Sequence, residues 1–378
     1  MMLINGKPAA RIIALEEAFL HPKVWEHYPD WLQQRFRLVK PRLMDVGPER
    51  IRRMDAAGID LQVLSHVQPG VQALTDAGLS VALCREVNDW LGEIVRAYPE
   101  RFAGFAMLPT QSPPDAADEL ERTVRQHQFK GALVNGHTNG KYLDDRSFSV
   151  LLSRAEALDV PIYIHPTDPP PPVIDAYYEN YPALIPAWGF LVETGTHLLR
   201  MIVSGVFDRH PKLKIIVGHM GELIPYTMAR LAQALTFGEW LIRAEAARAA
   251  HIAPSSAGME RSLNYYMSRN VFITTSGVFD QPVFECAKAY INIDNILFAV
   301  DDPFRDNIEG VDFLRSVNLS AADREKLAHG NAEQILKIPR ADGTVTTRSA
   351  IGFAANLESL RARIKSRLGR ALINALIR

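Results

Sequence analysis

Eight short, continuously apolar runs recur along the chain, and longer stretches with helical periodicity separate them. Continuous apolarity, rather than alternation, is expected of strands that are buried on both faces of a parallel sheet. Repeated strand–helix units define an α/β fold, and eight of them are the number that closes into a (β/α)8 TIM barrel. The predicted strands are residues 11–15, 61–65, 102–108, 131–135, 161–164, 213–218, 271–275 and 296–300.

The connecting stretches support this architecture over a doubly wound sheet. Residues 113–127 and 148–159 place apolar side chains on one helical face. A doubly wound sheet that binds a dinucleotide would need a glycine-rich turn after its first strand, and no GxGxxG follows residues 11–15. The sequence also has no P-loop and no GxSxG motif. These absences argue against nucleotide-dependent chemistry and serine hydrolysis.

The predicted barrel occupies residues 9–338 and carries one long insertion. Residues 20–48, rich in Trp, Tyr, Phe and Arg, follow the first strand, where the loops of a barrel cover its active site. Residues 339–378 form the predicted C-terminal extension, a polar linker followed by an amphipathic helix over 355–378. This helix has six basic residues and one acidic residue. We expect it to pack on the barrel, to contact a partner subunit or to bind a membrane surface.

The charge and cysteine content of the sequence indicate which binding partners and which cellular location to expect. The chain has 42 Lys+Arg and 43 Asp+Glu, a formal net charge of −1, which argues against a nucleic-acid binder that works by bulk charge. Its two cysteines, Cys84 and Cys286, lie far apart without metal-ligand spacing, so no disulfide framework is expected. Neither a secretory leader nor a transmembrane segment is predicted, and the expected location is the cytoplasm.

Polar side chains directly follow most of the predicted strands. In an α/β barrel, functional groups gather at the carboxyl ends of the strands. Each residue alone has a simpler explanation as a hydrogen-bonded loop residue or a turn former. Carboxylates and imidazoles that converge from four or more strands are, together, what a divalent metal site requires. The residues are Glu16 and Glu17, Ser65 and His66, Asn135, His165, His219, Ser276, and Asp301 and Asp302.

Seven motifs, in this order along the chain, resemble the ACMSD-like amidohydrolase-2 branch of the amidohydrolase superfamily. More narrowly, the sequence is similar to the non-oxidative, metal-dependent hydroxybenzoate decarboxylases, the group of γ-resorcylate and 2,3-dihydroxybenzoate decarboxylases. The resemblance runs from about residue 11 to residue 338. The motifs are IALEEAF (13–19), GALVN (131–135), PIYIHP (161–166), GVFDRHP (205–211), GHMGE (218–222), ITTSG (273–277) and FAVDDPF (298–304).

The resemblance implies one divalent metal ion, zinc, manganese or magnesium, and no organic cofactor. Glu16, His165 and Asp301 stand at the family's ligand positions, and His219 stands beside the metal as a further ligand and as the catalytic histidine. Asp301, His219 and Glu222 form the implied catalytic set. In the implied reaction, an ortho-hydroxybenzoate is chelated to the metal, Asp301 protonates the ring carbon and CO2 leaves.

The resemblance also implies an oligomer and a set of residues around the substrate. Arg230 matches an arginine that in the family reaches the active site of a neighbouring subunit, so a homodimer or homotetramer is expected. No nucleic-acid partner is expected. The residues expected to contact the small aromatic acid are His66, Asn135, Ser276, Arg230, Asp302 and Arg305.

Several departures from the family pattern bear on the substrate. Ala18 stands where many members have a histidine ligand, although the dihydroxybenzoate branch also has alanine. Thr167, Asp302 and Arg305 replace the family's arginine, aromatic and acidic residues, so the ring substituents are expected to differ from those of simple resorcylates. Two alternatives stay open: a metal-dependent hydrolase or hydratase acting on a lactone or unsaturated acid, and a non-catalytic binding protein.

Overall fold

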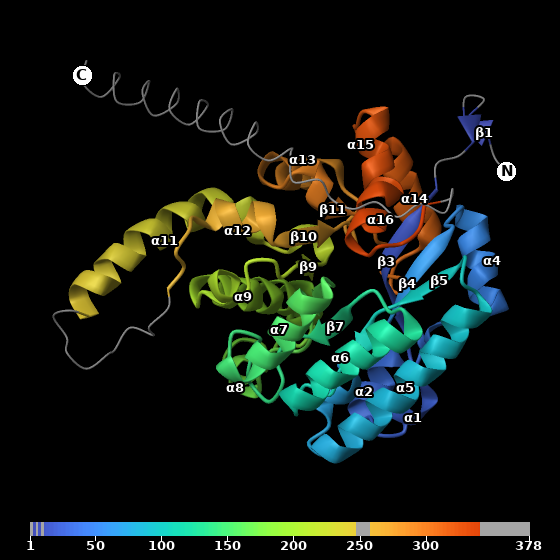
Figure 1. Cartoon of the computed structure of the whole chain (residues 1–378), viewed down its shortest axis with the longest axis horizontal. Helices are drawn as coiled ribbons and strands as arrows, with labels where there is room; N and C mark the ends of the chain where they lie inside the picture. The colour runs from blue at the N-terminus through green and yellow to red at the C-terminus, as the bar shows by residue number, and fades with distance from the viewer. Residues whose placement is uncertain (1–2, 5–6, 9–10, 247–257, 341–378) are drawn as a thin grey trace.

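The computed structural model of the chain describes residues 3–4, 7–8, 11–246 and 258–340. A ring of parallel strands forms the centre and helices surround it (Figure 1). All eight predicted strands are present, one of them as the two short segments β5 and β6. A small antiparallel pair, β1 (Leu3–Ile4) and β2 (Lys7–Pro8), precedes the ring. The ring strands are β3 (Ile13–Phe19), β4 (Leu61–His66), β5 (Phe102–Gly104), β6 (Ala106–Met107), β7 (Ala132–Asn135), β8 (Ile162–His165), β9 (Ile215–Val217), β10 (Val271–Thr274) and β11 (Ile296–Leu297).

Backbone contacts close the ring at two junctions. Strands β3, β4 and β5 pair in that order, and β6 to β11 pair in a second run. Phe105 lies between β5 and β6 and donates its backbone N–H to the carbonyl of Leu64 at 2.9 Å. A parallel bridge between Leu15 and Ala299 joins the first strand to the last. The predicted (β/α)8 barrel is confirmed.

The helices begin and end at residues that favour helix termini. Asp76 caps α5 (Ala77–Ala97) by accepting the N–H of Leu79 at 3.0 Å, and α4 (Pro48–Ala57) ends at Gly58, whose φ is 87°. The other helices that follow the insertion are α6 (Pro113–His127), α7 (Ser149–Leu158), α8 (Pro171–Tyr177), α9 (Phe190–Val203), α10 (Val206–Arg209), α11 (Ile224–Ala246), α12 (Leu263–Arg269), α13 (Gln281–Tyr290), α14 (Asn307–Ser316), α15 (Ala321–Glu325) and α16 (Asn331–Ile335). Short 3₁₀ or π turns are η1 (Gly70–Ala73), η2 (Arg146–Phe148), η3 (Ile185–Gly189), η4 (His219–Gly221), η5 (Ile293–Asn295) and η6 (Lys326–Gly330).

Two apolar cores stabilise the barrel. One lies between the strands and the helices, and the other fills the ring itself. The inner core contains Phe105 and Phe272 and continues into α16 through Ile335. Arg11, just before β3, pairs with Glu333 of α16 at 2.9 Å, which places α16 at the amino end of the barrel. A polar site is therefore expected at the opposite, carboxyl end of the strands.

The predicted insertion over residues 20–48 is folded into three short helices. These are α1 (Pro22–Trp25), α2 (Asp30–Phe36) and α3 (Lys40–Leu43), which bury Val24, Leu32, Phe36 and Leu43. In Figure 1, α1 and α2 lie at the end of the molecule away from α15 and α16. Arg35 Nη1 lies 2.9 Å from Asp168 Oδ1 in the loop after β8, so the insertion reaches across the mouth of the barrel.

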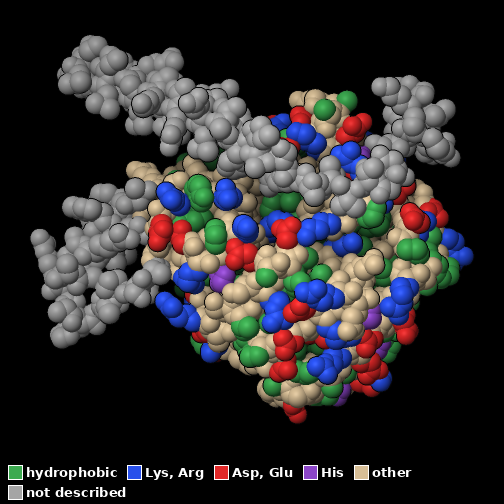
Figure 2. Space-filling view, viewed as in Figure 1, with side chains coloured by type: hydrophobic (Ala, Val, Ile, Leu, Met, Phe, Trp, Pro, Cys, Tyr) green, Lys and Arg blue, Asp and Glu red, His purple; other side chains and the backbone are tan. Residues whose placement is uncertain are grey.

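The predicted linker and basic C-terminal helix lie outside the described residues, apart from residues 339–340. Within the ranges that the structure describes, no helix is both long and apolar enough to cross a membrane. On the face shown in Figure 2, basic and acidic side chains are interspersed rather than segregated by sign.

Candidate active site

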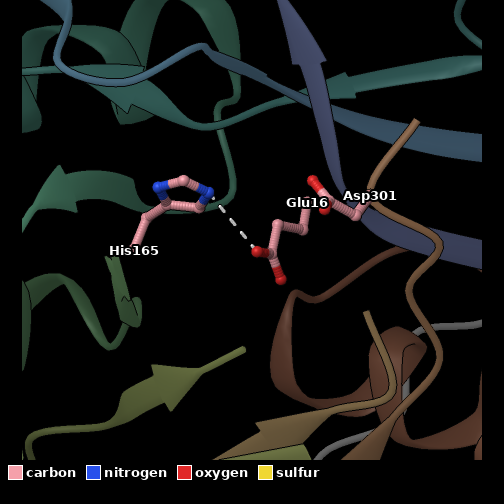
Figure 3. Close-up of side chains that lie close together, drawn as sticks. All are labelled: Glu16, His165 and Asp301. Carbon is pink, nitrogen blue, oxygen red and sulfur yellow. Dashed lines mark ion pairs between the residues drawn. The ribbon is translucent and has the colours of Figure 1, made fainter. Parts of the chain in front are cut away.

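Three residues that were predicted as metal ligands lie together at the carboxyl ends of the strands. Glu16 comes from β3, His165 ends β8, and Asp301 follows β11 (Figure 3). One potential ligand atom from each residue lies within 4.8 Å of those of the other two. His165 Nε2 is 3.5 Å from Glu16 Oε1. We call these three residues the metal group.

The donor set of the metal group fits a divalent metal ion. His165 Nδ1 donates to the carbonyl of Pro166 at 2.8 Å, and burial lowers the pKa of His165, so Nε2 has a free lone pair. That lone pair faces Glu16 Oε1, a buried oxygen with no hydrogen-bond partner in the described part of the chain. Two electron-rich atoms at this separation are stabilised by a cation between them. One imidazole and two carboxylates are suitable ligands for zinc or manganese.

A bulge in β3 and a set of hydroxyls orient Glu16. The register with β4 shifts between Ala14 and Glu17, and Glu16 has a φ of 62°. Tyr163 donates its hydroxyl to Glu16 Oε2, and Thr274 Oγ1 lies 3.3 Å from the same oxygen. Gly218 leaves the space for this arrangement, because a Cβ there would lie 2.7 Å from Oε2. These hydroxyl contacts fix Glu16 Oε2, while Glu16 Oε1 faces His165 and His219.

His219 lies beside the metal group and is paired with Glu222. Its Nδ1 is 3.0 Å from Glu222 Oε1, and its Nε2 is 3.6 Å from Glu16 Oε1 and 3.8 Å from Asp301 Oδ2. Burial opposes a charge on this ring, but the carboxylates of Glu16, Glu222 and Asp301 raise the pKa of His219 well above its usual value. His219 was predicted both as a ligand and as catalytic. The three-residue group does not include His219, and both roles stay predictions.

Strained backbone marks the same residues. Glu16, His219, Glu222 and Asp301 have φ angles of 62°, 49°, 56° and 76°, a region that non-glycine residues rarely adopt. Such conformations cost on the order of 1–3 kcal/mol each and persist where surrounding contacts enforce them, commonly at active sites.

Burial raises the pKa of Asp301 to about 6, although its hydrogen bond to His219 opposes that shift. This carboxyl group is therefore suited to exchange a proton near neutral pH.

Asn135 lies where a substrate-contacting residue was predicted. It ends β7, opposite His165 of β8 in the parallel register. Its side chain is buried, and Oδ1 accepts no hydrogen bond from any residue that the structure describes. A buried amide oxygen without a partner is available to a ligand. Arg230, by contrast, is exposed on α11 of its own chain.

At four other predicted substrate contacts, the side chains already have partners within the protein. Asp302 is fully buried, and its carboxylate pairs with Arg42 and Arg50 rather than facing a ligand. His66 is also buried: its Nε2 accepts the N–H of His21 at 3.2 Å and its Nδ1 donates to the carbonyl of Val67 at 2.9 Å.

The remaining two of these residues are Ser276 and Arg305. The hydroxyl of Ser276 is fully buried and accepts the backbone N–H of His219 at 2.8 Å, so it helps to hold His219. Arg305 is exposed and pairs with Glu309 of α14 at 2.8 Å. At each of these four residues a protein group engages at least one polar atom of the side chain, and contact with substrate stays a prediction.

Sequence reasoning missed the groups that position the site from inside the barrel. Tyr163 and Thr274 lie within apolar strands, and their hydroxyls contact each other at 2.8 Å and Glu16. The one available signal was a hydroxyl in the middle of a continuously apolar run. Arg42 and Arg50, in the insertion and α4, gave no signal because their partner is more than 250 positions away.

Comparison with known proteins agrees with this geometry. A family model described as amidohydrolase matches residues 24–338. A γ-resorcylate decarboxylase from Polaromonas sp. is 37% identical over 344 residues, which span 89% of this chain and 100% of that protein. A solved structure of a dihydroxybenzoic acid decarboxylase from Polaromonas sp., with bound manganese and the inhibitor 2-nitroresorcinol, is 37% identical with a TM-score of 0.77 and covers 88% of this chain and 99% of that one. The structure of a 5-carboxyvanillate decarboxylase from Novosphingobium aromaticivorans, also with manganese, is 32% identical with a TM-score of 0.80. The match covers 87% of this chain and 97% of that one.

The chain therefore belongs to the amidohydrolase family, and the predicted family membership is confirmed. The predicted enzyme class, a carboxy-lyase of this superfamily, is confirmed by decarboxylases that match nearly the whole chain. The predicted cofactor is confirmed at the level of a divalent metal ion.

Proposed function

We propose that this enzyme catalyses the non-oxidative, metal-dependent decarboxylation of an ortho-hydroxybenzoate, with Glu16, His165 and Asp301 as the metal ligands. The observation that carries the proposal is the buried, unpartnered Oε1 of Glu16 facing the lone pair of His165, in the part of the chain that the structure describes. The full-length relatives named for resorcylates and dihydroxybenzoates support the substrate class. The hydratase alternative has weaker support, because a hydratase from Sphingobium sp. is 24% identical over 330 residues, against 37% over 344 residues for the γ-resorcylate decarboxylase.

The residues of the site account for the proton that the reaction needs. A bound divalent ion supplies a Lewis acid for the substrate carboxylate and its neighbouring hydroxyl oxygen. Asp301 delivers a proton to the ring carbon that carries the carboxylate. The bond from that carbon to the carboxylate then breaks, its electron pair returns to the ring and CO2 leaves. Asp301 regains a proton from solvent, so the net change is one proton consumed and one CO2 released.

His219 and Glu222 support the charge that develops during this step. With Nδ1 of His219 bound to Glu222, Nε2 presents its N–H toward Asp301 and Glu16. Such a donor stabilises negative charge next to the reacting group. Asn135 offers its free amide oxygen to a substituent of the ring, which gives it a role in orienting the substrate.

Manganese is the first metal that we propose for this site, because two similar structures hold it. We also propose a cytoplasmic homodimer or homotetramer. Arg230 and Tyr226 are one helical turn apart on α11, and both are exposed, Tyr226 by 81%, so both side chains are accessible to a partner subunit. Sedimentation equilibrium of the full chain tests the oligomer, and a monomer at micromolar concentration would contradict it.

Product analysis tests the proposed reaction. Metal-free protein is loaded with MnCl2 or ZnCl2 and incubated with 2,6-dihydroxybenzoate, 2,3-dihydroxybenzoate and 5-carboxyvanillate, and CO2 and the phenol are measured by NMR. 4-Hydroxybenzoate is the matched control, since it lacks the ortho hydroxyl that chelation requires. We expect metal-dependent release from at least one ortho-hydroxybenzoate and none from the control. Equal release from the control, or a ring-opened acid as the product, would contradict the proposal.

A further inference from the structure

A second buried charge cluster lies directly behind the metal group. It contains Glu17, Asp302, Arg42 and Arg50, and we call it the arginine cluster. Arg42 Nη2 is 2.7 Å from Asp302 Oδ1, and Arg50 Nη2 is 3.0 Å from Asp302 Oδ2. The side chains of Asp302 and Arg50 are fully buried, whereas that of Arg42 is 40% exposed. The cluster therefore joins the insertion and α4 to the residue that follows Asp301.

The arginine cluster holds the backbone on both sides of Asp301. Glu17 accepts the N–H of Val300 at 2.9 Å and that of Asp302 at 3.0 Å. Its carboxylate therefore fixes the backbone immediately before and immediately after Asp301. Ala18 donates its N–H to the carbonyl of Asp302 at 2.7 Å. Asp301 has a φ of 76°, a strained conformation that persists only where surrounding contacts hold the backbone in place, as these hydrogen bonds do.

The insertion contributes to this support through Arg42. It approaches the loop after β11 by one ion pair and by one ring contact, Phe36 with Phe304, whose centroids are 6.1 Å apart. Arg50 and Glu17 belong to the barrel itself, so Arg42 is the charged link from the insertion to the loop that carries Asp301, whereas Arg35 pairs with Asp168 in the loop after His165. Without it, one oxygen of a fully buried carboxylate loses its cationic partner.

We propose that Arg42 is a positioning residue for the metal site: by pairing with Asp302, it fixes the orientation in which Asp301 binds the metal. This inference rests on the proposed metal ligands. Outer residues that orient a ligand typically change metal affinity or activity by 10–100-fold when they are removed. Arg42 is suited to this role because a guanidinium pairs with a carboxylate in a fixed geometry.

The test compares Mn²⁺ binding by metal-free full-length variants, measured by isothermal titration together with the melting temperature of each metal-free protein. Arg42→Ala is expected to weaken Mn²⁺ binding by about 10-fold or more. Arg42→Lys, which keeps one charged contact, should recover part of that loss. Arg53→Ala is the matched control, because Arg53 also forms a partly buried ion pair near the insertion, with Asp45 at 3.0 Å, but does not touch the loop after β11.

The result expected is a selective loss of Mn²⁺ affinity in Arg42→Ala, with melting temperatures of the metal-free Arg42→Ala and Arg53→Ala proteins close to each other. Wild-type affinity in Arg42→Ala, or an equal loss in Arg53→Ala, would overturn the inference and leave the metal site standing. His165→Ala, which removes the imidazole ligand outright, is the check on the metal site: Mn²⁺ binding as tight as in wild type would overturn the metal site itself, and the inference with it.

Discussion

Two neighbouring pairs of carboxylates, Glu16–Glu17 and Asp301–Asp302, are divided between two regions of the molecule. The first member of each pair lies in the metal group, and the second lies in the arginine cluster. In the arginine cluster, guanidinium groups and backbone N–H groups occupy the carboxylate oxygens. In the metal group, Glu16 Oε1 has no such partner in the described structure.

The difference between the two regions explains their roles. A carboxylate whose oxygens are neutralised by protein groups stabilises the fold, whereas a strained and incompletely paired one can bind a cation or move a proton. We therefore propose that the metal group is the reactive region and that the arginine cluster supports it. The following predictions test that division, from the largest expected effect to the smallest.

Asp301→Asn removes the proposed proton donor while keeping the shape of the side chain. We expect turnover to fall by about 10²–10⁴-fold, the usual contribution of a general acid, or more if metal binding is lost too. The thermal unfolding transition should stay close to that of wild type. CO2 release by Mn²⁺-loaded protein is the measurement, and activity at the wild-type level would remove Asp301 from the mechanism.

Asp302→Asn makes the corresponding change in the arginine cluster. It leaves Arg50 fully buried without its carboxylate, which should lower the free energy of unfolding by about 3–5 kcal/mol. Arg42→Ala, at a half-exposed partner, should cost about 1 kcal/mol or less. Urea unfolding of the metal-free proteins gives both values. Equal losses would mean that burial of Arg50 does not set the stability of this cluster.

His66 tests whether a polar residue at a strand end serves the fold rather than the substrate. Burial lowers the pKa of His66 to about 4, despite its hydrogen bond to Val67, so the folded protein keeps the ring neutral. Because the unfolded chain takes up this proton near pH 6.5, stability is fully present above that pH and is lost as the pH falls toward 4.

The expected loss from His66 is about 3 kcal/mol between pH 6.5 and 4. His66→Gln has an amide that can both accept and donate a hydrogen bond but does not titrate. Its free energy of unfolding should therefore fall less than that of wild type over the same pH range, by the amount attributed to His66. The matched control is the exposed His27, and His27→Gln should follow wild type. Parallel stability curves for His66→Gln and wild type would contradict the structural role.

Tyr163→Phe removes one hydroxyl that holds Glu16 Oε2. We expect Mn²⁺ affinity to fall by about tenfold, because Glu16 can then rotate away from the ligand position. Tyr142→Phe is the control, since its hydroxyl bonds Glu193 at 2.7 Å, outside the metal group. Titration of the metal-free proteins measures the effect. If Tyr163→Phe and Tyr142→Phe bind Mn²⁺ with equal affinity, Tyr163 does not orient Glu16.

Local patterns in the sequence predicted the barrel and placed Glu16, His165 and Asp301 among the polar residues at strand ends, and the family resemblance then implied these three, with His219, as metal ligands. Apolar runs identify buried strands, and residues at their carboxyl ends meet at one edge of the ring. The pattern could not decide which carboxylate of Glu16–Glu17 faces the site, because a bulge in β3 sets that orientation.

Contacts between distant residues account for what the sequence could not predict. Asp302 was expected to contact substrate, yet Arg42 and Arg50 pair with it from positions 260 and 252 residues away. The insertion, expected as a long loop, forms three helices because its apolar residues pack on the barrel. Such tertiary partners leave no periodicity in the sequence.

A crystal structure of the Mn²⁺-soaked protein, with anomalous diffraction data, tests the central claim most directly. The account predicts one anomalous peak per chain, within bonding distance of Glu16 Oε1, His165 Nε2 and a carboxylate oxygen of Asp301, with no metal at Asp302. A peak elsewhere, or none in that position at saturating Mn²⁺, would contradict it.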